Sequence, residues 1–195
     1  MTFKSSFLAF GCLISVSTLG LAQGPAMKAT TPPPAASATP AVVLSDSQIA
    51  GIVETANTSE IEAGKQAEKT SKTKSVKDFA KMMVDEHTQV NKDLKALAAR
   101  GKFKGTDSEQ EKALKASSKD SLSKLKGLKA AEFDKAYAAD QVNMHKTLLD
   151  SLDATLIPNA KHDELKTMLT KVRTSVATHL EKAKALSSSV GGAAM

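Results

Sequence analysis

The sequence has no tryptophan, one tyrosine and one cysteine among its 195 residues, and only two of its 27 basic residues are arginine. The single Cys12 excludes an internal disulfide and a cysteine-rich zinc site. Proteins that read phosphates and bases rely on arginine and aromatic side chains, so their scarcity argues against nucleic acid as a partner. The absence of periodic glycine and of repeated long apolar runs excludes collagen-like and multi-span membrane architectures.

The first 22 residues resemble a secretory signal peptide. Lys4 supplies a charged start, residues 7–21 supply a short apolar stretch, and the small residues Gly20 and Ala22 suit a cleavage site. Cleavage would remove Cys12 and leave a mature protein without cysteine. We therefore expect an exported protein in the periplasm or associated with the outer membrane, with an uncleaved membrane anchor as the alternative.

The remaining chain divides into a linker, a domain and a tail. Residues 23–44 are rich in proline, alanine and threonine and contain five of the six prolines, which predicts an extended linker. Residues 45–188 form the expected globular domain, and residues 189–195 a flexible tail rich in glycine and alanine.

The domain is predicted to be all-α, because apolar residues recur at three- and four-residue steps. The expected helices span approximately 46–70, 75–101, 106–127, 130–156 and 162–186. Ser45 with Gln48 has the spacing of a capping box, and Thr106 with Glu109 repeats it before the third helix. Arg100-Gly101 is expected to end the second helix, and the fourth is expected to stop before Pro158.

The four long helices each carry one apolar stripe, which predicts a four-helix bundle. Short connections make hairpins of the first and second helices and of the fourth and fifth. The segment 101–128 between the hairpins is long enough, as a helix, to run the length of the bundle once. This crossover makes the second and fourth helices parallel, as in ferritin-like bundles.

Polar residues interrupt every one of these apolar stripes. At helical spacing they stand on the faces expected to point inward, and counts from the hairpin turns place them at similar heights. They are Glu60, His87, Tyr137, Gln141, His145 and His179. The spacing therefore predicts a polar cluster inside the bundle.

Several of these residues lie in motifs that resemble a known exported bacterial family, domain of unknown function 4142. The motifs are Glu60-Ile61-Glu62-Ala63-Gly64, the stretch from Val76 to His87, and Phe133-Asp134, Tyr137, Gln141-Val142, His145 and His179-Leu180 in that order. The resemblance covers residues 45–186 and implies a ferritin-like fold and an envelope location, without an activity. It carries over Glu60, His87, Tyr137, His145 and His179, whereas Glu86 stands where the family usually has aspartate.

The inward polar residues have three open interpretations. The first is a buried network in which Glu60 pairs with an imidazole while Tyr137 and Gln141 complete the hydrogen bonds. The second is a site for a divalent transition metal such as zinc, copper or iron, held by Glu60, His87, His145 and His179. The third is haem bound by two histidines.

A di-iron centre is disfavoured, because it requires a Glu-x-x-His pair on each of two helices. Valine occupies the position three residues before His87 and before His145. Asp85 and Glu86, next to the first of these histidines, are expected to be solvated. Any metal site should therefore be mononuclear, without ferroxidase or oxygenase chemistry.

The sequence favours a non-catalytic envelope protein with a binding or structural role. The alternative is a mononuclear, histidine-rich metal-binding or redox protein of the periplasm. The net charge of +6 also allows binding to anionic envelope polymers, and a bundle of this kind can form a homodimer.

Overall fold

The computed structural model describes residues 43–191, and the statements below concern these residues. Its helices are α1 Asp46–Thr70, α2 Lys74–Gly101, α3 Glu109–Lys126, α4 Ala130–Ser151, the π-helical turn η1 Leu152–Leu156, α5 Ile157–Asn159 and α6 Asp163–Gly191. The described part of the chain has no strand, which confirms the all-α prediction. None of its helices is both long and apolar enough to cross a membrane. The predicted leader and nearly all of the predicted linker lie outside the described residues, although Leu44 at the linker's end is buried.

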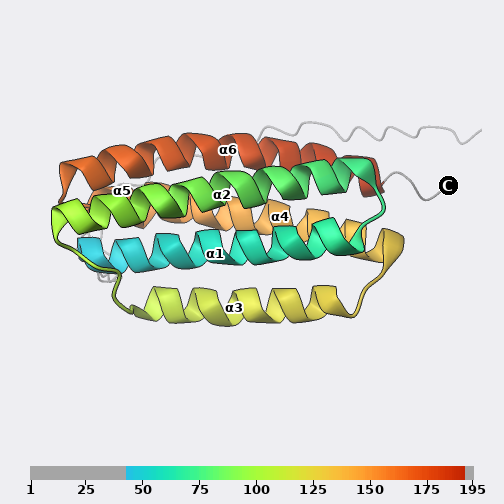
Figure 1. Ribbon diagram of the computed structural model, residues 1–195, viewed down its shortest axis with the longest axis horizontal. Coiled ribbons are helices and arrows are strands. Elements are labelled where there is room, and N and C mark those ends of the chain that lie inside the picture. The colour runs from blue at the N-terminus through green and yellow to red at the C-terminus, as the bar shows by residue number, and fades with distance from the viewer. Residues whose placement is uncertain (1–42, 192–195) are drawn as a thin grey trace, which may run out of the picture. The chain divides into compact units, whose positions relative to one another are not determined.

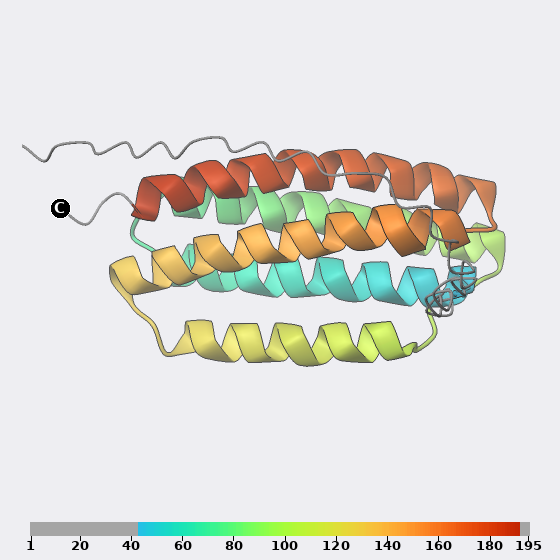
Figure 2. The same ribbon diagram turned by 180° about the vertical axis from the view of Figure 1, so that it is seen from behind.

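Helices α1, α2, α4 and α6 form an elongated four-helix bundle, and α3 lies outside it along α1 (Figure 1). The same arrangement is seen from behind in Figure 2, where α4 and α6 are in front. Helix α3 runs from the end of α2 back to the start of α4, so α2 and α4 point the same way (Figure 1). The helical crossover expected from the sequence is therefore confirmed.

Two groups of side-chain contacts fix the start of α1. Ser45 accepts a hydrogen bond from the backbone N–H of Gln48, and the Gln48 side chain accepts one from the Ser45 backbone, so the predicted capping box is present. The Asp46 carboxylate accepts hydrogen bonds from the backbone N–H groups of Lys161 and His162. These contacts join the first turn of α1 to the segment that precedes α6.

The α1–α2 hairpin contains a close helix contact at Gly64. A Cβ atom at this position would lie 2.9 Å from the backbone oxygen of Ala80 and 2.7 Å from Val84 Cγ2. The absence of a side chain therefore lets the two backbones approach each other beside the polar layer described below.

Several helix ends differ from the sequence prediction. Helix α2 begins at Lys74 rather than at the expected Ser75. Its last residue is Gly101, as expected, but the residue in the left-handed conformation is Lys102, with φ of 55°. Gly101 remains helical, and a Cβ atom there would meet the Phe103 ring at 2.6 Å. The chain thus reverses one residue later than the glycine suggested.

Helix α3 is capped by Ser108 instead of Thr106. The Ser108 hydroxyl accepts a hydrogen bond from the Glu111 backbone N–H, whereas the Thr106 backbone N–H donates to the Ser47 carbonyl of the α1 start. Because Thr106 is used to hold the loop, the capping motif two residues later starts the helix.

Pro158 does not stop the fourth helix where expected. The helix widens into the π-helical turn η1, and a short turn, α5, continues through Pro158. A wider turn accommodates the residue that cannot donate a backbone hydrogen bond.

The last helix, α6, continues beyond the expected Leu186 to Gly191, and Val190 is buried. Residues 192–195 of the expected tail lie outside the described residues.

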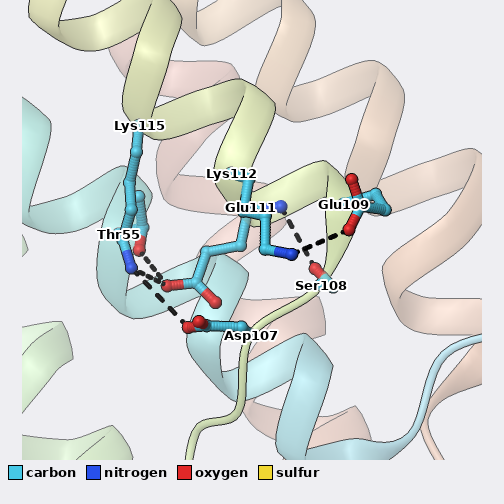
Figure 3. Close-up of polar contacts among 7 residues, drawn as sticks. All are labelled: Thr55, Asp107, Ser108, Glu109, Glu111, Lys112 and Lys115. Atoms are coloured by element: carbon cyan, nitrogen blue, oxygen red, sulfur yellow. Dashed lines mark hydrogen bonds and ion pairs between the residues drawn. The ribbon is translucent and has the colours of Figure 1, made fainter.

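Helix α3 contacts α1 through a buried polar group in addition to leucines such as Leu125, which is buried in the core. The Glu111 carboxylate accepts a hydrogen bond from the Thr55 hydroxyl at 2.9 Å and pairs with Lys115 at 2.6 Å (Figure 3). Lys115 also lies 3.9 Å from Asp107. Burial would raise the pKa of the Glu111 carboxyl, but Lys115, Thr55 and the Ser108 backbone together hold it below its usual value.

The bundle core consists of two apolar clusters with a polar layer between them. One cluster includes Ile49, Leu94, Leu152 and Leu169, and the other includes Ala67, Phe79, Phe133 and Leu186. In each of the four bundle helices, buried polar residues fall between the members of the two clusters. They are Thr55, Asn57, Ser59 and Glu60 in α1, His87 in α2, Gln141 and His145 in α4, and His179 in α6.

Candidate metal centre

Three histidines from three helices meet in the polar layer. His87 of α2, His145 of α4 and His179 of α6 are all buried, and one ring nitrogen of each lies within 4.8 Å of the other two. Their ring centroids are 6.0 Å apart for His87 and His145, 5.4 Å for His87 and His179, and 5.3 Å for His145 and His179. The three side chains therefore surround a common point between the helices.

Each imidazole is oriented by an oxygen acceptor on its outer side. His87 Nδ1 is 2.8 Å from the Asn57 side-chain oxygen, and His145 Nδ1 is 2.8 Å from the Gln141 carbonyl. His179 Nε2 is 2.8 Å from the Glu86 carboxylate. An amide oxygen, a carbonyl and a carboxylate can only accept, so each of these ring nitrogens must be the one that carries the proton.

The second nitrogen of each ring is left with its lone pair. His87 Nε2, His145 Nε2 and His179 Nδ1 are buried and have no hydrogen-bond partner among the described residues. Burial, followed by repulsion from the other two histidines, lowers the pKa of His87 to about 3. Burial also lowers the pKa of His179, although its bond to Glu86 opposes the shift. Neutral imidazoles with free lone pairs are the form that binds metal ions.

Glu60 lies beside this cluster but outside the set of atoms that could bind one ion. Its Oε1 is 4.0 Å from His145 Nδ1, the nitrogen already bonded to the Gln141 carbonyl. Burial raises the pKa of the Glu60 carboxyl, while His145 and the Gln141 side chain lower it and Asp140 raises it slightly further. Glu60 therefore occupies the outer side of one histidine, and the hydrogen bond expected between them is not formed.

The other two predicted residues lie on the same side of the layer as Glu60. Tyr137 is fully buried, stacks on Phe133 with ring centroids 6.0 Å apart, and meets Phe79 edge to face at 6.3 Å. Burial, and then the charge of Glu60, raise the pKa of the Tyr137 hydroxyl well above its usual value. Gln141 is likewise inaccessible to solvent and provides, through its backbone, the acceptor for His145.

Two residues that orient the histidines were not singled out by the sequence. Asn57 lies one turn before Glu60, accepts from His87 and also donates to Asn91 at 2.8 Å. Glu86 was expected to be solvated, yet it bonds to His179 while 48% of its side chain stays exposed. The sequence signals for these two residues were the position of Asn57 one turn from Glu60 and the position of Glu86 directly before His87.

The donor set is three imidazoles without a carboxylate. Such a set suits zinc, copper, nickel or iron in the divalent state, and it leaves one position of a tetrahedral ion for another ligand. In known metal sites the ligating imidazole usually donates its second N–H to a carboxylate, carbonyl or water, which fixes the ring. All three histidines have this arrangement here.

Comparison with known proteins identifies one family. The family model described as a domain of unknown function, DUF4142, matches residues 31–186. The comparisons with curated proteins and with solved structures found no match. Since the matched region includes most of the chain and every residue of the polar layer, the chain belongs to this family of unknown function.

Proposed function

We propose that this protein binds one divalent transition-metal ion through His87, His145 and His179, as an exported protein of the cell envelope. The function is metal binding, and the exported location is the expectation drawn from the signal-like leader. A purely structural polar layer is the competing function.

One observation carries the proposal. Three buried imidazoles each have one nitrogen held by an acceptor and the other unpartnered, and a ring nitrogen of each lies within 4.8 Å of the others. A buried polar atom without a partner costs about 1–3 kcal/mol. A structural network should bond its members to one another, whereas these histidines bond outward. A bound metal ion would satisfy all three free nitrogens at once.

The test is metal content and thermal stability of the protein purified without a histidine tag. We expect one ion per chain, and a higher melting temperature for apo-protein supplied with zinc, copper, nickel or iron. Mass action adds about 2.7 kcal/mol when the free metal is at 100 times its dissociation constant. For a domain of this size, that corresponds to an increase of roughly 5–10 °C.

The fourth histidine provides a matched control. His145→Gln should abolish the metal-induced increase in melting temperature, and His87→Gln gives an independent variant on another helix. His162→Ala should leave the increase unchanged, because His162 lies against Phe103 and is not part of the three-histidine group. Protein that binds no metal, or an increase that survives both glutamine substitutions, would contradict the proposal and favour the structural layer.

A further inference from the structure

The histidine cluster adjoins a cavity of about 210 Å³ between α2 and α6. His87 and His179 line this cavity, together with Glu86. His145 does not line it. The cavity thus reaches two of the three candidate ligands.

We propose that a metal ion in this cluster keeps one coordination position open to the cavity, and that this position takes water or a small monovalent anion. The inference rests on the proposed metal centre and adds the ligand class and its route. Three protein ligands on a tetrahedral ion leave a fourth position, which is the arrangement of catalytic rather than structural zinc sites.

The size of the cavity limits the ligand to a few heavy atoms. Pockets for drug-sized ligands are about 300–1,000 Å³, so 210 Å³ is small. Its walls include Val90, Val172 and Val176. A ligand that is compact and binds through one atom fits such walls, whereas one that needs several polar contacts does not.

Charge favours an anion with a single negative charge. The three imidazole ligands contribute no negative charge to a buried divalent ion, and an anion in the open position reduces the cost of burying it. Glu86 stands at the cavity, half-exposed and bonded to His179. Its carboxylate repels anions of higher charge more strongly than it repels monovalent ones.

The larger cavity on the other side of the bundle does not offer the same access. It has a volume of about 860 Å³ and lies among α1, α3 and α4, where it is lined by Glu60 and Asp140. None of the three histidines lines it. A ligand entering there would meet Glu60 on the outer side of His145, away from its unpartnered Nε2.

The test is a titration of the cobalt-loaded protein with azide. The visible absorption spectrum of cobalt reports changes in its coordination. Azide should change the spectrum in a saturable titration. Ser175→Phe, which places a ring at the lining of the cavity, should weaken azide binding at least tenfold at unchanged cobalt content. Gln89→Trp narrows the same cavity from α2 and should act similarly.

Thr174→Phe is the matched control, because it puts the same ring on the exposed neighbour of Ser175 outside the cavity lining. It should bind azide as the unmodified protein does. Cobalt that binds but ignores azide would show a closed site and overturn this inference alone. Azide binding that both cavity variants retain in full would overturn the route. Failure of cobalt, zinc and copper to bind would overturn the metal centre and this inference together.

Discussion

Two buried glutamates, Glu60 on α1 and Glu111 on α3, show how differently the same side chain can be used. Glu60 and Glu111 are 2% and 5% exposed, respectively, yet their pKa values move in opposite directions. The Glu111 carboxylate is charged and pairs with Lys115, and the Glu111 backbone N–H donates to the Ser108 cap. Glu60 has only the His145 ring within 4.0 Å as an ion-pair partner among the described residues.

This difference in partners distinguishes a buried carboxylate with a structural role from one that signals a function. Glu111 joins α3 to α1 through contacts that compensate for its desolvation, so its role is complete within the fold. Glu60 has no lysine or arginine partner among the described residues, and burial raises its pKa despite the opposing effects of His145 and the Gln141 side chain. A buried acid that the fold does not satisfy is a stronger functional signal than one that it does.

The largest effect should come from removing Glu111. Glu111→Ala leaves the Thr55 hydroxyl without its acceptor and removes the Lys115 pair, so the free energy of unfolding should fall by about 2–3 kcal/mol, as measured by urea denaturation. Glu109→Ala is the control from the same turn, since Glu109 makes only an exposed pair with Lys112. It should change stability by less than about 0.5 kcal/mol. Equal losses in both variants would contradict the assigned role of Glu111.

The α3 start also shows where sequence reasoning ends for the fold. Thr106 with Glu109 and Ser108 with Glu111 have the same capping spacing, and nothing local distinguishes them. Ser108 is the cap because Glu111, which follows it, contacts Thr55 on α1. The two residues are 56 positions apart in sequence. The start of α1, by contrast, depends on the local pair Ser45 and Gln48, and it was predicted to the residue.

The candidate site shows the same division. Helical spacing was enough to place His87, His145 and His179 on inward faces, because a buried stripe defines a direction for each helix. It could not tell Asn57 from Glu60 as the neighbour of His87, since both lie on the inward side of α1 one turn apart. It also missed Glu86, whose role depends on how α2 is rotated against α6.

The pH dependence of stability should distinguish Glu111 from an ordinary surface acid. Its folded-state pKa lies below the unfolded value near 4.5, so the unfolded chain binds the extra proton. The contribution of Glu111 is therefore complete above about pH 4.5 and is lost as the pH falls through the lower folded-state pKa. Besides Lys115, the charged groups that line the same pocket are Glu54, Glu62, Asp107, Lys119 and Lys126.

The measurement is the stability difference between the unmodified protein and Glu111→Gln across that pH range. It should shrink as the pH falls, because a protonated glutamate resembles glutamine. Glu109→Gln should show no such trend. A difference that stays constant down to the acid unfolding of the bundle would mean that the charge of Glu111 contributes nothing.

The smallest effect is expected for Glu60→Gln in the metal-free protein at neutral pH. Glutamine keeps the shape of the side chain and removes a buried acid that has no lysine or arginine partner, so the unfolding free energy should change by less than about 0.5 kcal/mol or rise. Glu111→Gln, measured beside it by urea denaturation, should lower stability because its carboxylate is paired. If Glu60→Gln were the more damaging of the two, Glu60 would be a satisfied structural acid like Glu111. The contrast between the two glutamates would then be lost, because both would be compensated by the fold.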